Sequence, residues 1–453
     1  MVAAKIYGLV LVSMLVIVFS INFAPALPIT GKVAGSAWTH RGGSLSADVQ
    51  GWAYNPAIAA AQDGTIYAAW TQHRNPSAWV FSGIYVKRWA GSSWEQLGAR
   101  IGHTSRDADW PEAYDPSIAV LGTTPYVAWY EGGGYGWGNC CKVSVFVAHW
   151  DGTRWIYDNN SAVPNGALNT DKSFDARNPV LAVVGGVLYV AWIEAGDYVA
   201  VKHLTANGWV QDGGRIPTGG SKVIDVAIAD AGGVPYVVFS GFQRSGSSNL
   251  PSTMRAYRLS AGAWVQMGGE IKAQTNDYTN YLAMAAIGTT PYVAMQEKSP
   301  NGNYQIYVKR WDGSAWVQDG GSLNIDPANG EAGRPALASD GTRLWLSWTE
   351  GLTAEKSKLY VRSLSGSTWS TAEGPLNVDA VNGPADSPAL AVGGVPHVIW
   401  AEKDMNSYTK QVYVKGRDST GSFVPTVLSR WGSSGPSVPI PPNTWVSMQA
   451  GGI

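Results

Sequence analysis

Cysteine and histidine are scarce in this sequence, and their scarcity limits the chemistry that the chain can perform. It contains 2 cysteines, the adjacent pair Cys140 and Cys141, and 6 histidines without the spacing of metal ligands. Adjacent cysteines exclude a disulfide between distant parts of one chain. A vicinal disulfide, two free thiols and an intermolecular bridge are the alternatives. Two cysteines with no histidine nearby make a poor zinc site, so we expect no metal and no other cofactor.

An excess of charge of one sign is also lacking, since 32 lysines and arginines oppose 33 aspartates and glutamates. The chain therefore offers no basic field to the phosphates of a nucleic acid, and we expect no nucleic-acid partner. The sequence contains no Gly-x-Ser-x-Gly elbow and no phosphate-binding loop. These absences remove several classes of enzyme from consideration.

Helical periodicity is absent as well, apart from an N-terminal segment that is apolar over residues 6–23. The apolar run follows Lys5 and precedes Ala24-Pro25-Ala26, which is typical of a secretory signal peptide over residues 1–26. The run is also near the minimum length of a membrane span, so an uncleaved N-terminal anchor is the alternative. In either case we expect an exported domain, extracellular or at the cell surface, which reaches a membrane only through this segment.

A repeated unit is the most informative feature that is present. Residues 85–94 and 307–316 share the pattern Tyr-Val-Lys-Arg-Trp, a Gly-Ser turn and a second Trp. A repeat of about 50–60 residues made of short strands predicts a β-propeller. One position, at the end of the second strand, recurs seven times: Trp70, Trp129, Trp192, Phe239, Met295, Trp348 and Trp400. We therefore predict an all-β, seven-bladed β-propeller of four-stranded antiparallel blades over residues 35–423.

The two ends of the repeat region compete to complete the last blade. Gly35-Ser36-Ala37-Trp38 matches the fourth-strand sequence Gly313-Ser314-Ala315-Trp316, but no first three strands precede it. Gly421-Ser422-Phe423 is a second candidate for the same place. We predict that the N-terminal strand at Trp38 closes the ring, because closure hides a sheet edge. Residues 424–453 then form a C-terminal tail, whose Pro-rich stretch suits a tether.

The loops of each unit differ in length, and this difference indicates one functional face. Short glycine turns connect strands one and two, and strands three and four. The connections between strands two and three and those into the next blade are long and variable, as at 72–83, 101–114, 132–142 and 241–253. Binding sites concentrate in variable loops on a rigid scaffold. We call the face that carries these loops the long-loop face.

Two groups of residues on the long-loop face are candidates for ligand binding. The first precedes strand one at the mouth of the central channel, where polar side chains beside aromatic rings suit a sugar or another small polar ligand. Its members are Trp52, Asn55, Trp110, Tyr114, Asp115, Asn178, Asp225 and Arg334. The structural alternative is that Asn and Asp before Pro favour turns. The second group is Trp137 with Cys140 and Cys141, in a loop whose glycines permit close ligand approach.

A third pattern consists of charged residues on neighbouring strands. Glutamates recur two residues after the second-strand marker and cations recur on the third strand, as Glu131, Glu194, Glu297, Glu350 and Glu402 with Lys87, Lys202, Lys309, Arg362 and Lys415. Opposite charges on adjacent strands predict cross-strand ion pairs. The alternative is a ring of carboxylates that holds a cation.

Two turns between third and fourth strands carry a family resemblance. Trp311-Asp312-Gly313-Ser314-Ala315-Trp316 and residues 150–155 resemble the Asp-box turn of sialidase-like propellers, and the repeats look like those of exported bacterial or archaeal propellers, a group that includes lectins. Sialidase activity would require an arginine triad, a Tyr nucleophile with a Glu partner and an Asp acid. The place of the first arginine reads Tyr54-Asn55-Pro56 here, and Arg177 and Arg334 supply only part of a triad, which argues against sialidase catalysis.

We therefore expect a non-catalytic recognition protein that binds a glycan or a surface protein partner through the long-loop face, and we assign no catalytic residue. One alternative is a glycoside hydrolase or lyase that uses Glu112, Asp115 and Asp225 at the channel mouth. The other is a structural component of a cell envelope, attached through residues 424–453.

Overall fold

The computed structural model describes residues 38–73, 82–102, 111–133, 143–158, 166–171, 173–245, 248–273, 279–351, 353, 356–405, 407 and 409–417. Residues 1–26, the tail 424–453, Phe423, Trp110, Trp137, Cys140 and Cys141 lie outside these residues. Within them, no helix is long and apolar enough to cross a membrane. The described part is all-β, as predicted, and its antiparallel sheets are mostly four-stranded.

Four sheets contain four strands each, numbered in chain order from the first to the fourth strand of the sheet. They are β6 (Pro111–Leu121), β7 (Thr124–Gly133), β8 (Ser144–Trp150) and β9 (Trp155–Tyr157); β15 (Lys222–Asp230), β16 (Pro235–Ser245), β17 (Ser248–Ser260) and β18 (Ala263–Gln266); β19 (Thr279–Ile287), β20 (Thr290–Lys298), β21 (Tyr304–Trp311) and β22 (Trp316–Gln318); and β23 (Glu331–Ser339), β24 (Arg343–Gly351), β25 (Lys358–Ser365) and β26 (Thr368–Trp369).

The remaining strands form two larger sheets. One contains β10 (Ala176–Val184), β11 (Val187–Glu194), β12 (Tyr198–Thr205) and β13 (Gly208–Gln211), with β14 (Ile216–Pro217) also paired to β12. The other contains β27 (Ala385–Gly393), β28 (Val395–Lys403), β29 (Lys410–Arg417) and β1 (Trp38–His40), together with β2 (Trp52–Ala60), β3 (Ile66–His73), β4 (Gly83–Trp89) and β5 (Trp94–Gln96). Trp52 and Lys410 form the parallel bridge that joins these two groups of four strands.

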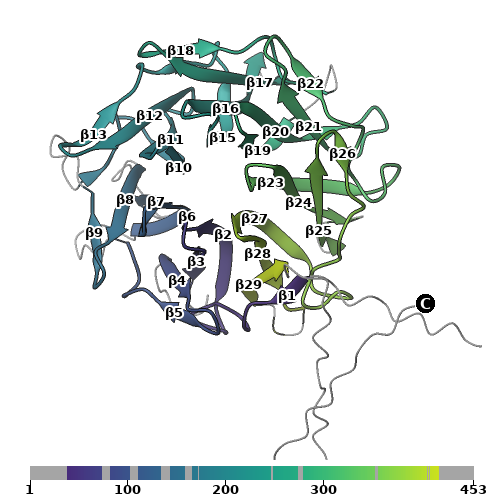
Figure 1. Cartoon of the computed structure of the whole chain (residues 1–453). Helices are drawn as coiled ribbons and strands as arrows, with labels where there is room; N and C mark the ends of the chain where they lie inside the picture. Colours follow the sequence, from purple (N-terminus) through teal and green to yellow (C-terminus); the bar gives the residue numbers. More distant parts are fainter. Residues whose placement is uncertain are drawn as a thin grey trace, which may run out of the picture. The chain divides into compact units, whose positions relative to one another are not determined.

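The first strands of the units contact one another around a central axis (Figure 1). The contacts run from β2 to β6, β10, β15, β19, β23 and β27, and β27 contacts β2 again. At the outside, the third and fourth strands alternate with exposed turns. The arrangement is β-propeller-like, and it places the starts of all the first strands near one another.

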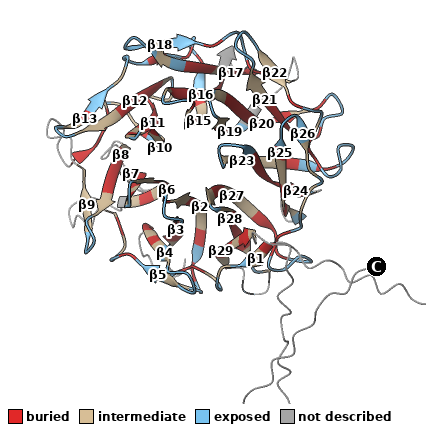
Figure 2. Ribbon diagram, in the orientation of Figure 1, coloured by how far each residue is buried: buried red, intermediate tan, exposed pale blue. Residues whose placement is uncertain are grey.

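Second strands are the most deeply buried elements, because each sheet packs against its neighbours on both faces (Figure 2). In β24 every residue from Leu344 to Glu350 is buried. The seven marker side chains, from Trp70 to Trp400, are all 0% exposed. Large rings bury about 150–250 Å² each, so these repeated aromatic residues supply much of the core. This is the structural role that the repeat predicts for them.

The recurrent glutamates join the marker tryptophan to the loop that enters the same sheet. Glu350 accepts hydrogen bonds from Trp348 Nε1 at 2.8 Å and from the backbone amides of Ile325 and Asp326 at 2.8 and 2.7 Å. Glu194 and Glu402 make the same three contacts in their own sheets. Gln72 takes this position beside Trp70. Backbone amides at a turn must donate a hydrogen bond when they are buried. Each of these glutamates therefore supplies an acceptor to amides that would otherwise be left without one.

Most of the third-strand cations, for which the pattern predicted ion pairs with these glutamates, contact the rings of the marker tryptophans. Lys87, Lys202, Arg362 and Lys415 lie over the rings of Trp70, Trp192, Trp348 and Trp400, with cation-to-centroid distances from 5.7 to 6.0 Å. Such cation–π contacts hold the third strand against the second. The recurrent charges thus have a structural role, as the pattern predicts, but the tryptophan ring lies between the cation and the glutamate.

Asparagines in the same entering loops connect consecutive sheets. Asn324 Oδ1 accepts the Ile306 amide of β21 at 2.9 Å, and Asn324 Nδ2 donates to the carbonyls of Tyr304 and Gly330 at 3.1 Å. Asn169 and Asn377 make equivalent contacts. The loop is thus bonded to the third strand of one sheet through its asparagine and to the second strand of the next through Glu350.

Tryptophans that open the fourth strands make a further contact between sheets. Trp155 Nε1 donates to the carbonyl of Leu97 at 2.8 Å, and Leu97 directly follows the fourth strand β5 of the preceding sheet. Trp264, Trp316 and Trp369 repeat the contact with Asp212, Met267 and Asp319. Trp94 donates to the carbonyl of Arg41 at 2.6 Å, and Arg41 directly follows β1. In this respect β1 stands where a fourth strand stands in the other sheets.

We expect Glu350→Ala to lower the free energy of unfolding by about 3 kcal/mol, because one indole N–H and two backbone amides lose their hydrogen-bond acceptor. Glu350→Gln keeps one acceptor oxygen and should cost less. Urea unfolding measures both effects. Glu95→Ala is the control, because Glu95 lies in an exposed ion pair with Arg88. Equal stability of the Glu350→Ala and Glu95→Ala proteins would contradict the assigned role.

Candidate functional site

A β-bulge interrupts the pairing of every first strand with its second strand. At the bulge, Asn55, Asp115, Asn178, Arg334 and Ser387 adopt φ angles from 48° to 53°, and each is followed by proline. This left-handed conformation is uncommon outside glycine and is best tolerated by Asn and Asp. Bulges redirect side chains. A turn was the structural alternative that the sequence offered for Asn or Asp before Pro. The structure shows that these residues lie at a bulge near the start of the first strand.

The bulged side chains line a cavity of about 500 Å³ on the axis. Five residues predicted from sequence meet there: Asn55, Asp115, Asn178, Asp225 and Arg334. Tyr281 and Ser387 complete the set, which we call the channel ring, and the sequence interpretation missed both. Ser387 precedes a proline, as Asn55 does, so an alignment of the repeats at this proline would have predicted Ser387 as a member of the ring.

Part of the channel ring is joined by side-chain hydrogen bonds. Arg334 Nη1 donates to Ser387 Oγ at 3.1 Å, and Ser387 Oγ donates to Asn55 Oδ1 at 3.3 Å. Asn55 Nδ2 donates to Asp115 Oδ1. At the other end, the Arg334 guanidinium lies over the Tyr281 ring at 4.7 Å. The ring therefore mixes donors, acceptors and one cation within a small volume.

The two carboxyl groups of the channel ring are shielded from solvent. Burial raises the pKa of Asp225 to about 7, although its oxygens accept the amides of Val226 at 2.9 Å and Leu282 at 3.0 Å. Burial also raises the pKa of Asp115, against the lowering effect of hydrogen bonds from Asn55 and Tyr130. Loss of solvation disfavours the charged form of a carboxyl. Both groups hold protons more readily than exposed aspartates do.

An aromatic row lies beside the channel ring, on β2, β3, β6 and β7. The ring centroids of Tyr54 and His73 are 5.3 Å apart, those of His73 and Tyr114 6.3 Å, and those of Tyr114 and Tyr130 5.6 Å. Burial lowers the pKa of His73 and raises that of Tyr54, so both rings are neutral near pH 7. Tyr114 was predicted from sequence, whereas His73 and Tyr130 were not.

Trp52 is the solvent-facing member of this region. It pairs with His73 across β2 and β3, and 46% of its surface is exposed. Glu112 lies on β6 near Tyr54, and burial raises the pKa of its carboxyl. An exposed indole beside polar groups is a surface on which the apolar face of a sugar ring can stack.

Arg177 and Arg334 line different cavities in the described part of the chain. Arg177 lies 3.5 Å from Asp175, and 55% of its side chain is exposed. Arg334 points instead to the channel ring. The two arginines are therefore not brought together as a triad would require.

No family model matches the chain, and no curated protein matches it. Among solved structures, an ulvan lyase of polysaccharide lyase family PL25 aligns with a TM-score of 0.53 and 12% identity, over 83% of this chain and 96% of that one. A Dyadobacter fermentans protein of unknown function aligns with a TM-score of 0.48 and 12% identity, over 84% and 98%. Trypanosoma rangeli sialidase aligns with a TM-score of 0.46 and 12% identity, over 81% of this chain and 55% of that one. At this identity the likeness to the lyase shows the fold alone.

We expect the contribution of Asp225 to the stability of the protein to fall as pH rises from about 4 through 7, because its carboxyl is protonated more readily in the folded chain than in the unfolded one. Asp225→Asn should remove this dependence. Urea unfolding at about pH 5 and pH 8 tests it: the stability of wild type relative to Asp225→Asn should be lower at pH 8. A difference that does not change with pH would show that Asp225 titrates normally.

Proposed function

We propose that this chain is an exported recognition protein that binds a glycan, without turning it over, through the long-loop face of a seven-bladed β-propeller. The apolar segment within residues 1–26, as a signal peptide or an anchor, supports export to the outside of the cell or to its surface. Residues 424–453 are proposed as a tail outside the propeller. The Asp-box likeness at 311–316 and 150–155 supports a sialidase-like repeat.

Blade number and closure form part of this proposal. Seven first strands contact one another in a cycle, which supports seven blades. β1 pairs antiparallel with β29, with Trp38 opposite Arg417, and Arg41 accepts the Trp94 bond that a fourth-strand exit accepts elsewhere. We infer that β1 is the fourth strand of the last blade, and that the N-terminal strand closes the ring.

The observation that carries the proposed function is the exposed Trp52 beside the aromatic row and the channel ring. Sugars are bound by stacking of their C–H faces on aromatic rings and by hydrogen bonds from a few convergent polar groups. Trp52 and Tyr114 offer rings. Asn55, Asp115 and Asn178 offer donors and acceptors at the cavity. The site lacks excess charge of one sign, which suits polyhydroxylated ligands.

The carboxyl groups support binding better than hydrolysis. A glycosidase needs one ionised carboxylate and one carboxylic acid that both reach the scissile bond. The oxygens of Asp225 accept two backbone amides, and Asp115 is bonded by Asn55 and Tyr130. Groups engaged in this way stabilise the channel ring. A protein partner at the same face is the second kind of ligand that we propose.

A glycan array with product analysis tests the function. We expect binding without cleavage, and Trp52→Ala should weaken the binding of each hit about tenfold through loss of the stacking surface. Val381→Ala is the control, because Val381 is 81% exposed on another entering loop. Cleavage abolished by Glu112→Gln would replace the proposal with an enzyme. A blank array, or equal binding by Trp52→Ala, would remove the glycan assignment.

Removal of β1 tests closure of the ring. A chain that begins at residue 42 should unfold several degrees lower than one that begins at residue 37, because it loses the β1–β29 pairing and the Trp94–Arg41 bond. Thermal unfolding followed by circular dichroism measures the difference. Identical midpoints for the two chains would exclude β1 as a necessary strand.

A further inference from the structure

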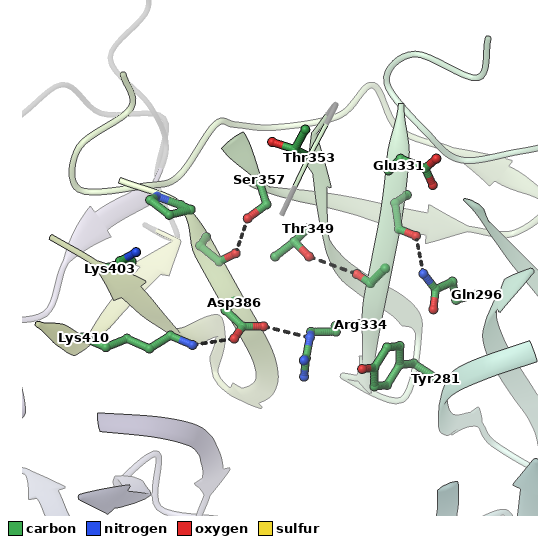
Figure 3. Close-up of a pocket in the computed structure, with 14 residues that line it drawn as sticks. Tyr281, Gln296, Glu331, Arg334, Thr349, Thr353, Ser357, Asp386, Lys403 and Lys410 are labelled. Carbon is green, nitrogen blue, oxygen red and sulfur yellow. Dashed lines mark hydrogen bonds and ion pairs between the residues drawn. The ribbon is translucent and has the colours of Figure 1, made fainter. Parts of the chain in front are cut away.

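We propose that a second cavity on the long-loop face, beside the channel ring, binds an anionic group of an acidic saccharide, either a carboxylate or a sulfate. The cavity has a volume of about 350 Å³ and lies among β23, β24, β27, β28 and β29 (Figure 3). The inference rests on the proposed glycan binding for the molecule that carries the anion. The cavity itself is argued from its own residues.

Cations predominate in the lining of this cavity. Arg334, Lys403 and Lys410 face two carboxylates, Glu331 and Asp386. Arg334 is the bulged residue of β23, whereas Lys410 begins β29 and is the cross-strand partner of Lys403 in β28. The two lysines thus place two positive charges at one edge of the cavity, where an anion is stabilising.

Asp386 holds two of these cations in place. Its Oδ1 lies 2.7 Å from Arg334 Nε and its Oδ2 2.5 Å from Lys410 Nζ, which places the carboxylate between them (Figure 3). Burial alone would raise the pKa of Asp386, but Arg334 and Lys410 outweigh burial and keep the pKa below its ordinary value. Asp386 therefore stays ionised at neutral pH. It takes one N–H group from each cation, so it competes with a ligand anion for Arg334 and Lys410.

Both cations retain hydrogen-bond donors beyond those that Asp386 takes. A guanidinium has five N–H groups and an ammonium has three. Arg334 uses Nε toward Asp386 and Nη1 toward Ser387, and Lys410 uses one N–H toward Asp386. The side chains of Arg334 and Lys410 are 38% and 20% exposed, so solvent and a small ligand reach them. Charge-assisted bonds to an oxyanion are about twice as strong as neutral ones.

An aromatic ring borders this cationic stretch. The Arg334 guanidinium lies over the Tyr281 ring at 4.7 Å, and Tyr281 is 37% exposed. Trp52 is the backbone bridge partner of Lys410, which makes β2 the neighbour of β29 at this point. An exposed ring beside cations suits a sugar that bears an acidic substituent.

A metal cation is a poorer match for the cavity than an anion. Among the described residues, no group of three or more His, Cys, Asp or Glu side chains is placed to hold a metal ion. Asp386 is already neutralised by two cations. A divalent cation would meet Arg334 and Lys410 at close range, and like charges in one site are mutually destabilising.

Calorimetric titration of the full chain with glucose, glucuronate and glucose 6-sulfate tests the assignment. We expect both acidic sugars to bind more tightly than glucose, with a difference that shrinks at high salt. Tighter binding of glucuronate identifies a carboxylate site, and tighter binding of glucose 6-sulfate identifies a sulfate site. Equal affinity for glucose and both acidic sugars would overturn the assignment.

Three variants separate the cavity from the rest of the face. Lys410→Gln should weaken the acidic sugars about tenfold and leave glucose unchanged. Asp386→Asn should strengthen the acidic sugars several-fold, because it removes the internal anion that competes for the two cations. Lys222→Gln is the matched control, since Lys222 also begins a strand and lies 3.9 Å from an aspartate, Asp197. It should change nothing.

The outcomes distinguish this inference from the proposed function. Glycan binding that depends on Trp52 but is indifferent to Lys410 and Asp386 would overturn the anion site and leave the function intact. Loss of acidic-sugar binding in Asp386→Asn, with no effect of Lys410→Gln, would also overturn it. Failure of every saccharide to bind would overturn both. If Lys410→Gln lowers the melting temperature, Lys403→Gln provides the same test with the Asp386–Lys410 pair intact.

Discussion

The contact between the second-strand tryptophan and the acceptor two residues later is the interaction on which the rest of the domain depends. It places a polar side chain beside the deepest part of the core, where only a fully bonded carboxylate or amide is tolerated. Glu350 meets this requirement by binding Trp348 on one side and two loop amides on the other. Glu194, Glu350 and Glu402 each anchor the entering loop to the sheet that the loop precedes. An anchored loop fixes the start of the first strand that follows it.

A bulge that recurs in the first strands at the axis allows the side chains to vary. The same bulge recurs at the start of every first strand, yet its residue is Asn, Asp, Arg or Ser in the units where φ is positive. Asp225 and Tyr281 occupy the corresponding places in the other two. The fold thus presents a set of chemically different groups at equivalent positions. The side chains that differ between units are the ones available to a ligand. The buried second strands and their hydrogen-bonded acceptors, which recur, stabilise the fold.

Several polar groups at the axis are connected across neighbouring sheets. Arg334 contacts Tyr281, Ser387 and Asp386, which belong to the two neighbouring sheets. One arginine therefore links the axial cavity with the cationic cavity beside it. Such shared residues couple neighbouring sites, because a ligand that reorients the guanidinium in one cavity changes the donors available in the other.

The sequence by itself determined the all-β class, the buried marker positions and five members of the channel ring, because these depend on a pattern that repeats along the chain. It did not reveal the acceptor role of Glu350, since spacing shows that two charges are near but not that Trp348 lies between them. Nor did it reveal Asp386, Lys410 or the aromatic row of His73 and Tyr130. These residues come from different units and meet only when neighbouring sheets pack. The tertiary structure alone decided which side chains share a cavity, because contacts between sheets have no periodic signal in the sequence.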